Sequence, residues 1–112
     1  MQSKWRLICN TKNETSTRKV VSWIAKEAGA RLTNLEIATY HKGGHTVSFA
    51  IDHSDMAWND FVIEVIELGQ RVAYGWLLTG SVNDDLDGSS SQPRVSGVEA
   101  IFWHLSREDS KS

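Results

Sequence analysis

Residues 83–88 read Asn-Asp-Asp-Leu-Asp-Gly and concentrate side-chain oxygens in one short stretch. Oxygen ligands at the first, third and fifth positions, followed by a glycine, match the opening of a calcium-binding loop. The twelfth position of such a loop needs a bidentate Glu, and this chain has Arg94 there. Helices are not expected on either side. We therefore predict no metal, and interpret the acids as a solvated loop or as a loop that recognises a partner.

Other metal-binding and nucleophilic side chains lack suitable neighbours in the sequence. His41 and His45 flank a glycine turn, but no Cys or carboxylate joins them at ligand spacing. Cys9 falls within an expected strand, on the face shared by Trp5 and Leu7, as a buried structural thiol would. No phosphate-binding loop, Gly-x-Ser-x-Gly or dinucleotide motif occurs. We predict no cofactor and no catalytic residue.

Acidic residues are concentrated in the middle of the chain, although the net charge is only −2. Residues 1–51 carry +5, whereas residues 52–88 hold eight acids and one Arg, a balance of −7. This predicts an acidic surface. Its members fall into two groups, which are Asp60, Glu64 and Glu67 in the first and Asp84, Asp85 and Asp87 in the second.

The first acidic group should lie on an amphipathic helix within residues 55–68. Apolar residues recur there with helical spacing, and the stripe consists of Trp58, Phe61, Val62, Val65, Ile66, Gly69 and Val72. Asp60, Glu64 and Glu67 lie off the stripe and should face water. We expect Ser54 or Asp55 to cap this helix and Gly69 to end it.

The remaining pattern predicts an α+β protein. A second helix should run from a cap at Thr15 or Ser16 to Ala28, with Gly29 beyond its end. A long loop is expected at residues 80–97, whose ends could extend the flanking strands into a hairpin. The expected strands are 4–10, 31–40, 46–52, 72–78 and 98–105. This order favours two helices on one face of a mostly antiparallel five-stranded sheet, as in a ferredoxin-like β-α-β-β-α-β pattern with an added C-terminal strand.

Length and composition indicate one domain over residues 1–112, with residues 106–112 as a frayed tail. A single cysteine excludes an internal disulfide. Because we find no signal peptide and no membrane span, we expect a cytoplasmic protein and no membrane partner. Five tryptophans are many for this length. We expect most in the core; one or two on the uncovered sheet face would make a binding surface, because Trp is enriched among interface anchors.

Residues 76–80 (Trp-Leu-Leu-Thr-Gly) and 97–103 (Gly-Val-Glu-Ala-Ile-Phe-Trp) give the chain a resemblance to bacterial immunity proteins. These small partners neutralise polymorphic and contact-dependent growth-inhibition toxins. The resemblance implies a stoichiometric inhibitor that is not an enzyme. Many such toxins are basic nucleases, and their inhibitors cover the nuclease active site with acidic residues. Either acidic group, with aromatic anchors, would then contact the cognate toxin.

Three other classes of function stay open. One is a ferredoxin-like domain that binds a small molecule or regulates as a homodimer. Another is an enzyme that uses paired carboxylates such as Asp60 with Glu64, in a concave pocket. A nucleic-acid-binding module comes last. The aromatic RNA-binding signature of such sheets is absent, and the −7 segment would repel phosphate.

Overall fold

The structure is a computed structural model that describes residues 1–107. The chain contains two helices, α1 (Glu14–Ala28) and α2 (Trp58–Val72), with strands before, between and after them. The strands are β1 (Gln2–Cys9), β2 (Leu32–Thr39), β3 (His45–Asp52), β4 (Ala73–Tyr74), β5 (Leu77–Ser81), β6 (Asp85–Ser90), β7 (Gln92–Pro93) and β8 (Val98–Ser106).

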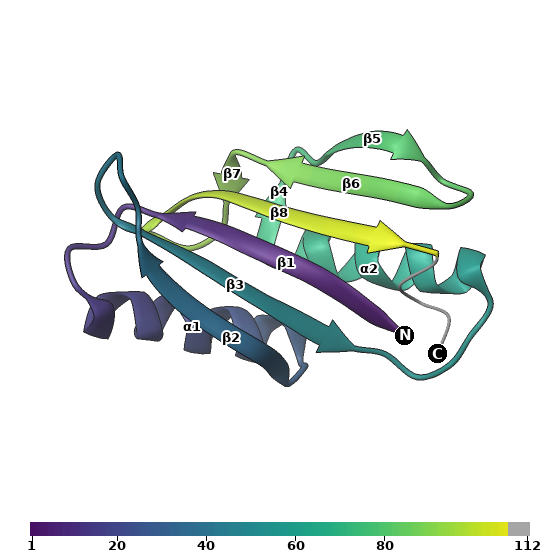
Figure 1. Cartoon of the computed structure of the whole chain (residues 1–112), viewed down its shortest axis with the longest axis horizontal. Coiled ribbons are helices and arrows are strands. Elements are labelled where there is room, and N and C mark those ends of the chain that lie inside the picture. Colours follow the sequence, from purple (N-terminus) through teal and green to yellow (C-terminus); the bar gives the residue numbers. More distant parts are fainter. Residues whose placement is uncertain (108–112) are drawn as a thin grey trace.

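Six strands form the main sheet in the order β2-β3-β1-β8-β6-β5, and each neighbouring pair is antiparallel. Strands β4 and β7 pair separately. Both helices lie behind the main sheet in Figure 1, which leaves its other face open. The predicted α+β class and the helices on one face of an antiparallel sheet are therefore confirmed, with six strands in place of five.

Alternation along the strands sends one set of side chains toward the helices. On β1, Ser3, Trp5, Leu7 and Cys9 are buried, whereas Lys4 and Arg6 are exposed on the open face. The predicted stripe of α2 packs against this buried set, except that Ile66 is only half-buried and Leu68 joins the stripe. One core thus lies between the helices and the sheet. Neither helix has the length and apolar character of a membrane span.

The predicted strand over residues 72–78 is wrong, because α2 continues through Gly69 to Val72. A Cβ on Gly69 would lie 3.1 Å from Trp76 Cε2 and 3.3 Å from Trp103 Nε1. Gly69 therefore does not end the helix. Its missing side chain lets the indoles of Trp76 and Trp103 approach the helix closely. Only Ala73 and Tyr74 form a short strand before Trp76 turns back toward the core.

The predicted loop over residues 80–97 is also wrong in extent. Most of it forms the hairpin of β5 and β6, followed by β7. The hairpin is inserted between α2 and β8, so β8 pairs with β1 and the hairpin lies outside β8. Gly88 makes this packing possible, because a Cβ there would lie only 2.3 Å from Trp103 Cε2.

The predicted helix starts are corrected as well. Asn13 caps α1, since its side chain accepts a hydrogen bond of 2.9 Å from the Ser16 N–H. At α2 the N-cap is Ala57, which makes no side-chain cap. The end of α1 at Gly29, with φ of 64°, is as predicted.

Ser106 belongs to β8 rather than to a frayed tail, and residues 108–112 of that predicted tail lie outside the described residues.

Candidate functional site

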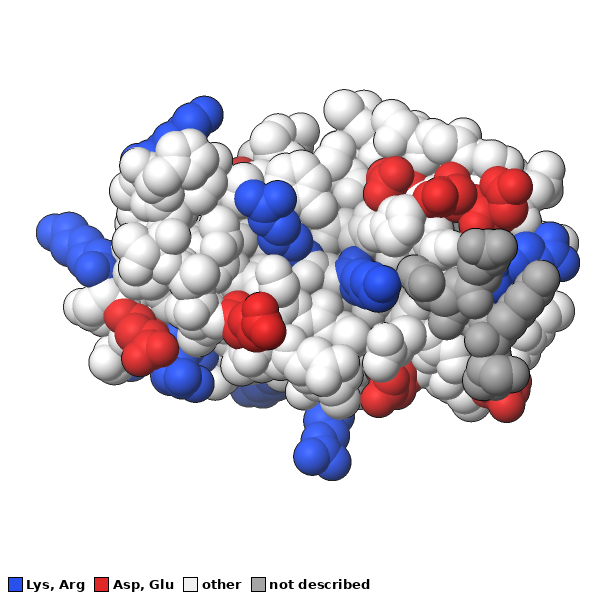
Figure 2. Space-filling model, in the orientation of Figure 1, with Lys and Arg blue, Asp and Glu red and all other residues white. Residues whose placement is uncertain are grey.

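The two predicted acidic groups lie on opposite sides of the main sheet. Asp85 and Asp87 alternate along β6 with the buried Leu86 and Gly88, and so face the open side. Asp84 lies in the turn before them. Figure 2 looks onto this face and shows acidic side chains gathered over β6, beside basic ones nearer the middle of the sheet. The other group lies on α2, behind the sheet.

The hairpin group, Asp84, Asp85 and Asp87, lies beside a histidine of the neighbouring strand. His104 Nδ1 lies 2.7 Å from Asp87 Oδ1 and 3.5 Å from Asp85 Oδ1. The ligand atoms of these three residues lie within 4.8 Å of one another, close enough to contact one small cation. All three side chains are solvated, and the hydrogen bond between His104 and Asp87 explains their approach without an ion.

The α2 group has a different environment. Asp60 and Glu67 are exposed, and within residues 1–107 neither of them forms an ion pair. Ile63 lies between them on the same helix and is 55% exposed. Positions 60, 63 and 67 follow one another at three- and four-residue intervals, which places them on one side of the helix. The outer surface of α2 therefore combines an exposed apolar side chain with uncompensated negative charge.

Glu64, the third member, has a side chain that is 44% exposed, and it joins a hydrogen-bond network of buried groups that the sequence did not reveal. Its Oε2 lies 2.5 Å from Nδ1 of His53, whose side chain is only 2% exposed. His53 Nε2 lies 2.7 Å from Ser3 Oγ, and Trp5 Nε1 donates to the same Ser3 oxygen over 2.8 Å. The network connects β1, the end of β3 and α2. Its only sequence signal is a histidine directly after a strand.

The order Ser3, His53, Glu64 has the spacing of a hydrolytic triad, but the serine cannot act as a nucleophile in this structure. Ser3 has no exposed surface. A substrate carbonyl could not reach its Oγ, which also accepts the Trp5 hydrogen bond. The described geometry therefore suits a structural role, in which buried polar groups satisfy one another and fix α2 against the sheet.

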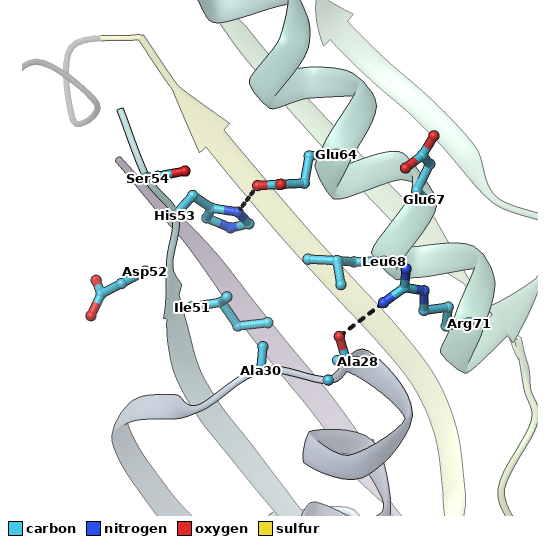
Figure 3. A pocket seen from close by; sticks show the side chains of 11 residues that line it. Ala28, Ala30, Ile51, Asp52, His53, Ser54, Glu64, Glu67, Leu68 and Arg71 are labelled. Carbon is cyan, nitrogen blue, oxygen red and sulfur yellow. Dashed lines mark hydrogen bonds and ion pairs between the residues drawn. The ribbon is translucent and has the colours of Figure 1, made fainter. Parts of the chain in front are cut away.

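A hollow of about 300 Å³ lies between the end of α1, the end of β3 and α2. Figure 3 shows His53, Glu64, Glu67 and Arg71 around it. Arg71 Nη1 donates to the Ala28 carbonyl over 3.2 Å, at the C-terminal end of α1. That end of a helix carries partial negative charge. The Asp52 carboxylate points away from the hollow in Figure 3, so the acidic side chains that face it are Glu64 and Glu67, opposite the guanidinium of Arg71.

A second hollow of about 400 Å³ lies on the open face of the sheet. Lys4 and Arg6 of β1 and Phe102 and His104 of β8 contribute to its lining. No tryptophan forms an exposed anchor on this face, because the indoles of Trp5 and Trp103 are buried toward the helices. The exposed aromatic ring is that of Tyr74, outside the main sheet.

Comparisons with protein-family models, curated proteins and solved structures find no match for this chain.

Cys9 is completely buried, and this burial raises the pKa of its thiol from 9.0 to about 11. As the pH rises, the thiol loses its proton in the unfolded chain before it does so in the folded protein. The stability that comes from keeping this thiol neutral is therefore fully present below pH 9. It is lost as the pH rises through 11. We expect the free energy of unfolding to fall by about 3 kcal/mol from this source over that range. Urea denaturation at several pH values should show a steeper fall for the wild type than for Cys9→Ala. Equal slopes would contradict this assignment.

Proposed function

We propose that this chain is an immunity protein that neutralises a cognate bacterial toxin by forming a stoichiometric complex, with no catalysis of its own. The observation that carries the proposal is the outer surface of α2. There Ile63 is 55% exposed between Asp60 and Glu67, and neither acid has an ion-pair partner within the described residues. Such a surface suits a basic protein partner.

Each part of this surface has a physical role in the complex. Uncompensated carboxylates raise the rate of encounter with a positively charged protein and select against acidic ones. Ile63 supplies apolar area that can be removed from water at the centre of the contact. The neighbouring hollow, lined by Glu64 and Glu67, can hold a Lys or Arg side chain of the partner.

A nuclease is the class of toxin that this surface fits best. An enzyme that binds nucleic acid needs basic side chains against the phosphates. An acidic inhibitor surface can occupy those side chains and exclude the substrate. We assign the contact to Asp60 and Glu67 of the α2 group, because Glu64 already interacts with His53, and Asp85 and Asp87 of the hairpin group interact with His104.

The finer fold assignment is also a proposal. We infer that β2-β3-β1-β8, with α1 and α2 behind them, correspond to the ferredoxin-like core, and that the β5–β6 hairpin is an addition at its edge. The strand order and the placement of both helices support this assignment. The last strand of the core is then β8 rather than residues 72–78.

A small-molecule-binding or regulatory domain is the second candidate, favoured by the hollow on the open face. Lys4 and Arg6 in its lining would suit an anionic ligand, and Phe102 would suit an aromatic one. A thermal-shift screen with small ligands and metals separates the two candidates. A large shift with one compound would favour the second candidate, because a ligand that binds only the folded state raises its stability.

Protection of cells tests the proposed function. The reading frame beside the gene for this chain would be expressed in cells with and without it. We expect growth to stop with the neighbour alone and to resume when both are made. If the neighbour is toxic and this chain gives no protection, the proposal fails for that toxin.

A further inference from the structure

The outer side of α1 carries uncompensated positive charge. Lys19, Ser22 and Lys26 are exposed and follow one another at three- and four-residue intervals, which places them on one side of the helix. The buried positions of α1, such as Val20 and Ile24, lie on the side that faces the sheet. Within residues 1–107 neither lysine forms an ion pair. Lys19, Ser22 and Lys26 therefore form a basic ridge that is open to a partner.

The basic ridge has the same spacing as the outer surface of α2. Its two lysines are seven residues apart, as are the two carboxylates of Asp60 and Glu67. Seven residues of a helix span about 10 Å. Three positions after the first charge, α1 has the small Ser22 and α2 has Ile63, which is 55% exposed. Two such helices, side by side and running in the same direction, would bring each lysine to one carboxylate and place Ile63 over Ser22.

The two helices meet at their C-terminal ends. Both lie behind the main sheet in Figure 1, α1 at the left and α2 at the right. Arg71 Nη1, near the end of α2, donates to the Ala28 carbonyl at the end of α1. A half-turn about an axis near this point, lying in the plane of contact, places each α1 over the α2 of another copy. The paired helices then run in the same direction, both toward the axis.

We propose that the basic ridge of α1 contacts the outer surface of α2 in a second copy of this chain, and that the two copies make this contact twice around a two-fold axis. Charge complementarity favours a second copy as the occupant. Because the basic and the acidic surface belong to the same helix layer, one copy supplies the complement of both at once. A two-fold contact of this kind is closed and self-complementary.

The dimer would be held by two kinds of interaction. Lys19 pairs with Asp60, and Lys26 pairs with Glu67, twice in each dimer. Such exposed ion pairs are individually weak. Between them, the Ile63 side chain is removed from water, which adds a hydrophobic contribution. We therefore expect a dimer that dissociates at low protein concentration and weakens as salt screens the charges.

This dimer covers the surface that we assign to the toxin, and that consequence rests on the proposed function. Asp60 and Glu67 cannot contact a second copy and a toxin at the same time. The two copies would have to separate before the toxin binds. The free protein would thus keep Ile63 covered until a toxin replaces the second copy.

Light scattering and sedimentation over a range of protein concentrations test the dimer. The wild type should change from one to two chain masses as concentration rises. Lys19→Glu with Lys26→Glu should raise the dissociation constant at least about tenfold, because every ion pair becomes repulsive. Arg6→Glu with Lys42→Glu changes the net charge equally, on β1 and in the turn before β3, and should leave it within a few-fold. A monomeric wild type, or a dimer that the ridge variant does not weaken, would overturn the proposal.

Mixing two variants tests the two-fold arrangement itself. Asp60→Lys with Glu67→Lys should self-associate as weakly as Lys19→Glu with Lys26→Glu. In a mixture of these two variants, one contact joins native residues and the other joins reversed charges, so both are attractive and association should return toward the wild-type value. Melting curves establish that each variant folds. If folded variants self-associate as the wild type does, or if mixing restores nothing, α1 and α2 do not form the contact.

Addition of the toxin separates this inference from the proposed function. Mixed in equal amount with the wild-type dimer, the toxin should give complexes of one chain and one toxin. Complexes of two chains with two toxins would overturn the shared surface. A wild type that is monomeric and still binds the toxin would overturn the dimer and leave the proposed function standing.

Discussion

The double reversal Asp60→Lys and Glu67→Lys is expected to lower affinity for the cognate toxin by about 100-fold at low salt. Both carboxylates are exposed and have no ion-pair partner among residues 1–107, so both charges are available to a basic protein. The loss should come mainly from slower association, since exposed charges act over a distance. Calorimetry and stopped-flow kinetics at several salt concentrations would measure it, and the salt dependence should become flatter.

The matched control is Asp84→Lys with Asp87→Lys, which changes the net charge by the same amount on the opposite side of the sheet. We expect this variant to keep its affinity within a few-fold. Loss of binding in the control alone would move the contact to the hairpin. If neither double reversal changes the affinity, the charge argument is wrong.

Phe61→Ala is expected to lower the free energy of unfolding by about 3–5 kcal/mol, the usual cost of removing a buried aromatic ring. Phe61 has no exposed surface and packs against Trp58, with ring centres 5.7 Å apart, and against His53 at 4.9 Å. Since small domains are stable by only about 5–15 kcal/mol, this variant should be close to unfolding. Urea denaturation would measure the change.

Ile63→Ala, two residues along α2, separates folding from binding. This side chain is 55% exposed, and its removal should change stability by less than about 0.5 kcal/mol. The same variant should weaken toxin binding, because Ile63 lies at the centre of the proposed contact. If Ile63→Ala unfolds the protein, the description of the α2 surface is wrong. If it folds and binds as the wild type does, Ile63 is no anchor.

Periodicity predicted the elements that have one clearly apolar face. The stripe of α2 and the alternation of β1, β3 and β8 appear in the structure close to where the sequence places them. The error at residues 72–78 had a physical cause. Gly69 can end a helix or admit a large neighbour, and only the position of Trp76 decides between the two.

A hairpin at the ends of the 80–97 loop was foreseen, but its strands within that loop were missed for a related reason. Its strands hold Gly, Ser and Asp, which individually favour turns, and only pairing with β8 stabilises them as a sheet. Gly88 is needed there to accommodate Trp103. These two residues lie on different strands and come into contact only when the chain folds. Local propensity does not contain that information.

The sequence identifies the acidic residues but does not show that they lie on two different surfaces. Their placement on opposite sides of one sheet follows from the inserted hairpin. Nor could the sequence foresee that His53 binds Glu64 or that His104 binds Asp87, because each pair joins distant segments. These contacts decide which carboxylates remain available for a partner.

The most direct test of the central claim is the mass of a co-purified complex. The tagged chain would be expressed together with the reading frame beside its gene, and the eluate weighed by light scattering. We predict a stable complex with one toxin for each copy of this chain. Recovery of this chain alone, together with continued toxicity of the neighbour, would contradict the account.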